Sequence, residues 1–279
     1  MKNRRLRRLR MGLETVLGWR RMGFFAPYRY AATVPPAGPY PELEEAFRRA
    51  QHAEGGIGDT LAAIERTVGR IAAVDGPPPE PRWRQSWFPR LDAAAAYTIA
   101  LGSGARRIVE VGSGHSTRFL VRAGRDAGGA ARITCIDPEP RASVAGLEID
   151  WRREVLGVQH LPLFAALESG DIAFFDSSHL LWPGTDVDLI LNRILPALRP
   201  GVLVHIHDVF LPDPYPADWE WRGYTEQLGL AGYLTGRDWR IVWASYYAVT
   251  RMSAEKRPAI AALPLPEGAR ESSLWLRRV

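Results

Sequence analysis

The sequence predicts an α/β fold, in which helices cover both faces of a mostly parallel sheet and a helical N-terminal extension precedes it. Three observations lead to this prediction. From residue 83 onward, short apolar segments of strand length alternate with helical patterns. Apolar strands that are separated by helices indicate a parallel sheet buried on both faces. Segments rich in proline and glycine set this part of the chain apart from the part that precedes it.

The alternation of strands and helices is regular up to residue 208. The expected strands are 106–111, 132–137, 171–176 and 201–208. The expected helices are 91–101, 116–127, 161–169 and 186–198. Two further apolar segments, 239–250 and 272–279, have no helix of comparable strength between them. We expect these two segments to form a terminal antiparallel pair.

Two breaks divide the N-terminal part of the chain. VPPAGPYPE, residues 34–42, precedes a helical stretch from about residue 43 to residue 73, and DGPPPEPRW, residues 75–83, follows that stretch. We therefore expect a basic, helical accessory region over residues 1–82 and one α/β domain over residues 83–279.

Composition excludes several classes of protein. Hydrophobic residues make up 46% and charged residues 24% of the 279 residues, which excludes disorder of the whole chain. The single cysteine, Cys135, cannot form an internal disulfide and indicates a reducing compartment. No uninterrupted apolar run approaches the ~20 residues that a membrane-spanning helix needs. We expect a cytoplasmic protein.

The first 21 residues carry most of the positive charge. They hold eight Lys and Arg residues against Glu14 alone, a net charge of +7, whereas the whole chain has +5. Leucines and Val16 recur among the arginines at helical spacing, and aromatic residues follow. Such a helix packs on its own domain or on a second subunit in a homo-oligomer; the alternative is peripheral contact of residues 1–30 with the inner membrane surface. A transit peptide is also compatible with this composition.

A glycine-rich turn ends the first predicted strand of the domain. In EVGSGHST, residues 110–117, the glycines allow a sharp turn and the close approach of a ligand to the backbone. Thr117 stands where a dinucleotide-binding fingerprint has its last glycine, which argues against NAD. Asp137 ends the next strand, where a carboxylate can accept both ribose hydroxyls of a nucleoside.

The glycine turn, the acid that ends the next strand and the order of elements together resemble the class I S-adenosylmethionine-dependent methyltransferases. The resemblance covers about residues 84–279 and implies a Rossmann-like fold with a seven-stranded sheet, mostly parallel, with one antiparallel strand near its end. In that family the glycine segment holds the amino-acid part of the cofactor, and the acid after the second strand holds its ribose. The resemblance thus implies S-adenosyl-L-methionine as cofactor, and as its ligands Glu110, Gly112, Ser113, Gly114, Ser116 and Asp137.

Polar residues also end the strands predicted at 171–176 and 201–208. Asp176 ends one strand and Asp208 the other, so the two carboxylates can face one cavity. His179 follows Asp176 by three residues, and His207 directly precedes Asp208. Methyl transfer to a hydroxyl requires removal of the hydroxyl proton, and histidine can accept it near neutral pH. We expect Asp176 and His179 to be catalytic, with His179 as the base.

The motifs DSSH and HDVFLP also resemble a bacterial subgroup related to metal-dependent sugar O-methyltransferases. In those enzymes aspartates bind magnesium and the histidine of the first motif acts as the base. The resemblance implies a metal site made of Asp176, His207 and Asp208. His207 stands where the relatives have glutamate, and imidazole suits manganese better than magnesium. Two alternatives follow, a different divalent metal or a histidine that works without one. His205, inside the strand, is expected to be a core residue.

Residues 211–234 form the expected substrate loop after the strand predicted at 201–208, with a helix from about Thr225. Trp219, Trp221 and Tyr224 either stack on the acceptor or cover the core. Trp87 and Phe88 are expected to close over the cofactor from the other side.

The function that fits these features best is O-methylation of a small hydroxylated metabolite, a sugar or a glycosylated compound. The alternatives are a metal-independent methyltransferase that acts on an amine, RNA or protein, and a nucleoside-binding protein without catalysis. The near-neutral domain argues against a nucleic-acid partner, since phosphate contacts need basic residues. An inert binder would have no use for an acid and a base beside a methyl donor.

Overall fold

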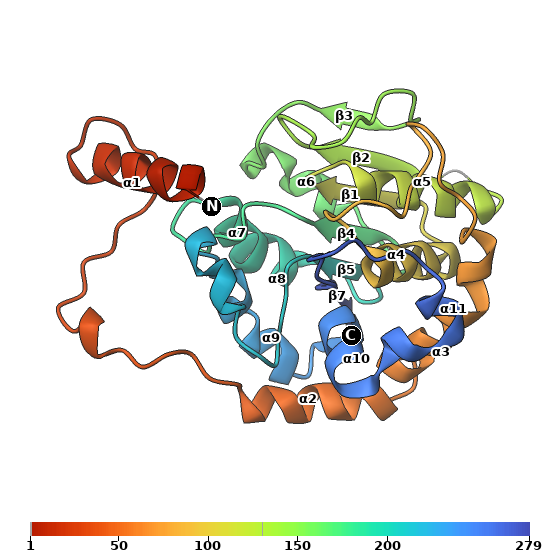
Figure 1. Ribbon diagram of the computed structural model, residues 1–279. Helices are drawn as coiled ribbons and strands as arrows, with labels where there is room; N and C mark the ends of the chain where they lie inside the picture. The colour runs from red at the N-terminus through yellow and green to blue at the C-terminus, as the bar shows by residue number, and fades with distance from the viewer. Residues whose placement is uncertain (1, 130) are drawn as a thin grey trace.

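Residues 2–129 and 131–279 are described by the structure, a computed structural model. Among them, seven strands form one sheet in the order β3-β2-β1-β4-β5-β7-β6 (Figure 1). β7 is antiparallel to both of its neighbours, and the pairs from β3 to β5 are parallel. The strands are β1 Arg107–Val111, β2 Arg132–Ile136, β3 Asp150–Arg152, β4 Ile172–Phe175, β5 Leu203–Ile206, β6 Trp239–Ala244 and β7 Leu274–Arg278. The expected Rossmann-like methyltransferase fold is confirmed.

Helices lie on both sides of this sheet. Figure 1 shows α4 and α5 on one side and α7 and α8 on the other. α5 packs on α4, and α4 packs in turn on α3. The bounds are α3 Ile57–Thr67, α4 Arg90–Ser103, α5 His115–Asp126, α6 Leu161–Ala165, α7 Asp186–Leu189, α8 Leu195–Ala197 and α9 Ala231–Thr235. Within the described part of the chain, no helix is long and apolar enough to cross a bilayer.

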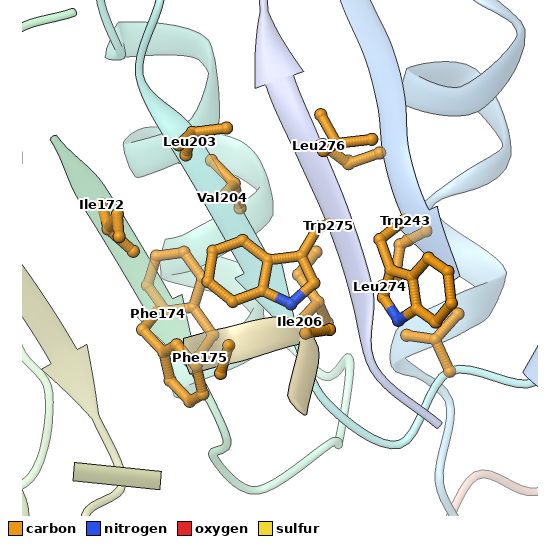
Figure 2. Packing of buried hydrophobic residues seen from close by; sticks show 14 of the residues in the cluster. Ile172, Phe174, Phe175, Leu203, Val204, Ile206, Trp243, Leu274, Trp275 and Leu276 are labelled. Atoms are coloured by element: carbon orange, nitrogen blue, oxygen red, sulfur yellow. The ribbon is translucent and has the colours of Figure 1, made fainter. Parts of the chain in front are cut away.

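The core of the sheet holds the ends of β4 and β5 in place. Figure 2 shows large side chains of four adjacent strands packed together, from Phe174 on β4 to Trp243 on β6. Trp275 on β7 and Phe174 have no exposed surface, and their rings meet edge to face at 5.9 Å. His205 stacks on Phe174 at 3.7 Å, and its burial holds its pKa well below the usual value, so it is a neutral core residue as expected. This rigid layer lies directly beneath the turns that follow β4 and β5.

The expected helical stretch 43–73 is interrupted. α2 (Pro41–His52) ends before a turn in which Gly55 has φ +68°, and α3 begins after it. A Cβ on Gly56 would lie 2.0 Å from the Ala50 carbonyl oxygen. The turn therefore requires glycine at position 56 for space, and glycine at position 55 suits its backbone angle. The prediction missed this break because apolar periodicity continues on both sides of it.

Both helices of the 41–67 region join the core of the sheet domain. Phe47 stacks on Tyr247 at 5.4 Å, and the Thr60 hydroxyl donates to the Val242 carbonyl. The Trp83 indole also donates to Ile71 O at 2.9 Å, across the expected boundary at residue 82. α1 (Lys2–Val16) differs, since it lies away from α2 at the end of a long irregular segment (Figure 1).

The prediction of a strand over 239–250 is correct for its first half and wrong for its second half. β6 ends at Ala244, and the rest of that segment forms α10 (Ser245–Met252), which buries Tyr247 against α2. Aromatic runs do not distinguish a buried strand from a short helix, so contacts with α2 decide the outcome. The antiparallel pairing of β6 with β7 is confirmed.

Helix 186–198 is also irregular. It consists of α7, a π-helical turn over Ile190–Ile194, and α8. Pro196 has no backbone N–H to continue the α-helical ladder, which accounts for a change of hydrogen-bond pattern at this place. The three-residue strand β3 was not expected, because no apolar run marks it.

Candidate active site

The glycine turn after β1 brings two strand ends together. Gly112 has φ +78°, and a Cβ there would lie 1.9 Å from the carbonyl oxygen of Asp176, at the end of β4. Gly114 has φ +152°, and a Cβ there would lie 3.3 Å from the backbone nitrogen of Ala142. Only glycine satisfies both the backbone angle and the close approach at position 112.

Glu110, on β1, binds the residues that follow the glycine turn through hydrogen bonds. Its buried carboxylate accepts hydrogen bonds from the Ser116 hydroxyl at 2.6 Å and the Thr117 hydroxyl at 2.7 Å. Burial raises the pKa of Glu110 to about 7, against the opposite effect of these hydrogen bonds. The Thr117 oxygen also accepts from the backbone N–H of Gly114. Glu110 and Ser116 thus shape the turn from behind, and their expected contact with the cofactor stays a prediction.

A cavity of about 250 Å³ lies over the ends of β1, β2 and β4. Ser113 and Asp137 line it, and the Asp137 carboxylate accepts from the Ser113 N–H at 2.6 Å and from the Glu139 N–H at 2.8 Å. Glu139 lines the same cavity, and the sequence prediction missed this second acid although it stands only two residues after Asp137. We call this space the nucleoside cavity. Its lining comprises Val111, Gly112, Ser113, Ile136, Asp137, Pro138, Glu139, Arg141, Val155, Leu156, Asp176, Ser177 and Asp186.

A second cavity, of about 400 Å³, adjoins the first turn of α5. Two buried atoms in its lining have no hydrogen-bond partner, His115 Nδ1 and Arg118 Nη1. Burial and the neighbouring charges of Arg118 and Arg82 lower the pKa of His115 to about 4, so its ring is neutral. Arg84 and Arg141 add further positive charge, and Arg141 also borders the nucleoside cavity. An anion would accept from the unpaired Arg118 Nη1, and from His115 Nδ1 in the tautomer that carries its proton there.

A third cavity, of about 380 Å³, opens over the ends of β4 and β5. Asp176 lines it together with His207 and Asp208, and Asp176 also lines the nucleoside cavity. Trp87 and two tryptophans of the expected substrate loop, Trp219 and Trp221, form its wall. We call this space the acceptor cavity. Phe88, in contrast, is buried against Phe174 in the core and closes over neither cavity.

Four predicted side chains meet beneath the acceptor cavity. Asp176, His207 and Asp208 line the cavity, whereas the buried His179 lies behind them, outside its lining. His179 Nε2 lies 3.2 Å from Asp176 Oδ1 and 3.6 Å from Asp208 Oδ2. His207 Nδ1 lies 3.4 Å from Asp176 Oδ1 and 3.6 Å from Asp208 Oδ1. His179 and Asp208 have φ +59° and +55°, unusual values for residues other than glycine. The sequence prediction that these four residues converge is met in the structure.

Two buried acids behind the histidines were not predicted. Glu226 Oε2 lies 2.8 Å from His179 Nδ1, and Asp92 Oδ2 lies 3.3 Å from His207 Nε2. Asp92 also accepts from the backbone N–H groups of Ser272 and Ser273. A charged residue in the otherwise apolar helix LDAAAAYTIAL was the available signal for Asp92.

The surrounding acids favour the charged form of both imidazoles. Burial alone would lower the pKa of His179, but hydrogen bonds with Asp176 and Glu226 and the charge of Asp208 outweigh it, so the pKa lies well above its usual value. Burial would also lower the pKa of His207, but the charges of Asp176 and Asp208 outweigh it, so this pKa too lies well above its usual value. Although burial opposes it, the two histidines hold the pKa of Asp176 well below its usual range.

The contacts among these side chains are ion pairs. In the part of the chain that the structure describes, no group of three or more His, Cys, Asp or Glu side chains is arranged to hold a metal ion. The expected ligands Asp176, His207 and Asp208 do meet, but each histidine nitrogen pairs with a carboxylate. The arrangement therefore fits paired acids and imidazolium ions.

Arg222 organises the aromatic residues of the substrate loop. Its guanidinium lies 3.9 Å from the ring centre of Trp219 and 5.3 Å from those of Trp221 and Tyr224. Tyr224 in turn packs on the ring of His179 at 4.6 Å. Trp219 and Trp221 thus face the acceptor cavity, while Tyr224 supports His179 from outside its lining.

Residues 109–209 match the model of a family described as a methyltransferase domain, a match that covers about a third of the chain. It begins within β1 and ends just after Asp208. This part of the chain is therefore similar to a methyltransferase domain.

Two solved structures are distantly similar to this chain. A methyltransferase of Podospora anserina with bound S-adenosylhomocysteine is 16% identical over 92% of this chain and 99% of that chain, with a TM-score of 0.40. An O-methyltransferase of Bacillus cereus, also in complex with S-adenosylhomocysteine, is 13% identical over 85% of this chain and 100% of that chain, with a TM-score of 0.41. No curated protein matches the sequence.

Proposed function

We propose that this chain transfers a methyl group from S-adenosylmethionine to a hydroxyl group of a small hydroxylated acceptor, such as a sugar or a glycosylated metabolite. One observation carries the proposal. Asp176 lines both the nucleoside cavity and the acceptor cavity, so that two ligands would meet beside the four polar side chains. Methyl transfer needs this proximity of donor and acceptor.

The residues present fit the cofactor at both of its ends. The nucleoside part would lie against Ser113 and Asp137, where glycine at position 112 leaves the backbone open. The carboxylate of the amino-acid part would lie toward the basic cavity, where His115 Nδ1 and Arg118 Nη1 lack partners. When bound, S-adenosylmethionine supplies an electrophilic methyl group.

The polar side chains of the acceptor cavity would bind the hydroxyl and take its proton. Asp208 lines the cavity and is within 3.6 Å of both histidines, so a hydroxyl that donates to Asp208 lies next to both candidate bases. A base must first be neutral, and the acids around His179 raise its pKa. The positive sulfonium of a bound cofactor would act in the opposite direction and lower the pKa of His179. His179 is thus suited to act as the base once the cofactor is in place.

Isothermal titration of the purified chain with S-adenosylmethionine and S-adenosylhomocysteine tests the cofactor. Titrations before and after chelation, and after addition of manganese, test the metal separately. A transfer assay with radiolabelled cofactor and a panel of methyl glycosides then tests the acceptor. We expect binding of both cofactor forms without added metal, and methyl transfer to oxygen. Failure to bind either form would overturn the proposal, while binding without transfer would favour a protein that holds the nucleoside only.

A further inference from the structure

A large apolar groove lies between the N-terminal segment and the catalytic domain. Its volume is about 770 Å³, twice that of the acceptor cavity. Met11 and Val16 of α1 and Phe25 form one wall, and Leu181 and Trp182 form the other. The ring of Phe24 packs on that of Trp182 at 5.1 Å and joins the two walls.

The groove adjoins the acceptor cavity. Trp221 and Arg222 line both spaces, so they form the boundary between them. The two sides differ in chemistry, because Asp176, His207 and Asp208 face the cavity whereas the groove is lined mainly by apolar side chains. A ligand that spans the boundary would thus have a polar, hydroxylated end and an apolar end.

We propose that the acceptor is an amphiphile, whose hydrocarbon chain lies in this groove while its hydroxylated head lies in the acceptor cavity. This inference rests on the proposed function and names its substrate class. Phe25 is 63% exposed and Val16 59% exposed beside the groove, so a hydrocarbon chain in the groove could cover both side chains. The groove belongs to the active site because the Leu180–Trp182 segment directly follows His179.

The test uses n-alkyl β-D-glucosides from methyl to octyl, below the concentrations at which they form micelles. Their dissociation constants for the full chain are measured by calorimetry, both without cofactor and with S-adenosylhomocysteine, so that no turnover takes place. We expect each added methylene to tighten binding about fourfold until the groove is filled. Phe25→Ser should flatten this dependence on chain length. Trp19→Ser is the matched control, because Trp19 is an exposed aromatic residue outside the groove lining, and it should preserve the dependence.

Equal affinity for all chain lengths would overturn the proposal, and so would a dependence that Phe25→Ser leaves intact. A second outcome would also overturn it: the chain co-sediments with phosphatidylglycerol vesicles, Phe25→Ser abolishes this, and alkyl chain length has no effect. Phe25 and its apolar neighbours would then contact a membrane surface instead. The proposed function would be overturned by a different result, the absence of binding of both S-adenosylmethionine and S-adenosylhomocysteine. The two failures can be told apart, because the dependence on chain length is a binding measurement that needs no methyl transfer.

Discussion

The nucleoside cavity and the acceptor cavity share Asp176, yet they are built in different ways. The nucleoside cavity is made largely by backbone, with Gly112 pressed against Asp176 and the Ser113 N–H bound to Asp137. The acceptor cavity is made by ionisable side chains, which are held by buried acids from distant parts of the chain, Asp92 and Glu226. Backbone contacts therefore determine the shape of the nucleoside cavity, whereas buried acids determine the charges that line the acceptor cavity.

This difference teaches which changes each side tolerates. One added atom can block the nucleoside cavity, because backbone atoms form its wall. The ionisable side chains of the acceptor cavity can change protonation without a change in their positions. Substitutions on the two sides should therefore separate the binding of the cofactor from the chemical step.

The largest effect is expected from Gly112→Ala. Its methyl group would overlap the carbonyl oxygen of Asp176, at a backbone angle that alanine rarely adopts. We expect S-adenosylhomocysteine binding to weaken at least ~100-fold in calorimetry, because the turn must move. Gly104→Ala is the matched control, since Gly104 has φ +68° but no atom near its missing Cβ. Equal cofactor affinity in the two variants would show that the close approach at Asp176 does not shape the cavity.

A smaller effect, restricted to the chemical step, is expected from His179→Ala. Turnover should fall about 10²-fold while the affinity for S-adenosylhomocysteine stays within about twofold, because His179 does not line the nucleoside cavity. Steady-state kinetics and calorimetry on the same preparation give both numbers. His52→Ala serves as control, since His52 is exposed at the end of α2. Normal turnover of His179→Ala would remove this residue from the mechanism.

The same difference explains how much the sequence could predict. The glycine turn and Asp137 lie within one local segment, so their spacing predicts the nucleoside cavity, and the ends of β4 and β5 are adjacent in any such sheet. Asp92, Glu226 and the groove beside α1 depend on contacts between segments far apart in the chain. No local pattern marks a carboxylate that becomes buried beneath a histidine, and none marks where a terminal helix will lie.

The subtlest effect is a shift of pH dependence in Glu226→Gln. Glu226 and Asp176 raise the pKa of His179 by hydrogen bonding with its charged form. As a base His179 must be neutral, so kcat/KM of the native chain should rise with pH through a pKa above ~6.5. Loss of the Glu226 charge lowers that pKa, and the rising limb should move toward lower pH in a pH–rate profile. Glu255→Gln, which removes an acid outside the acceptor cavity, should leave the limb in place. A limb at the same pH in Glu226→Gln would mean that another group, with His207 and Asp208 the nearest, takes the proton.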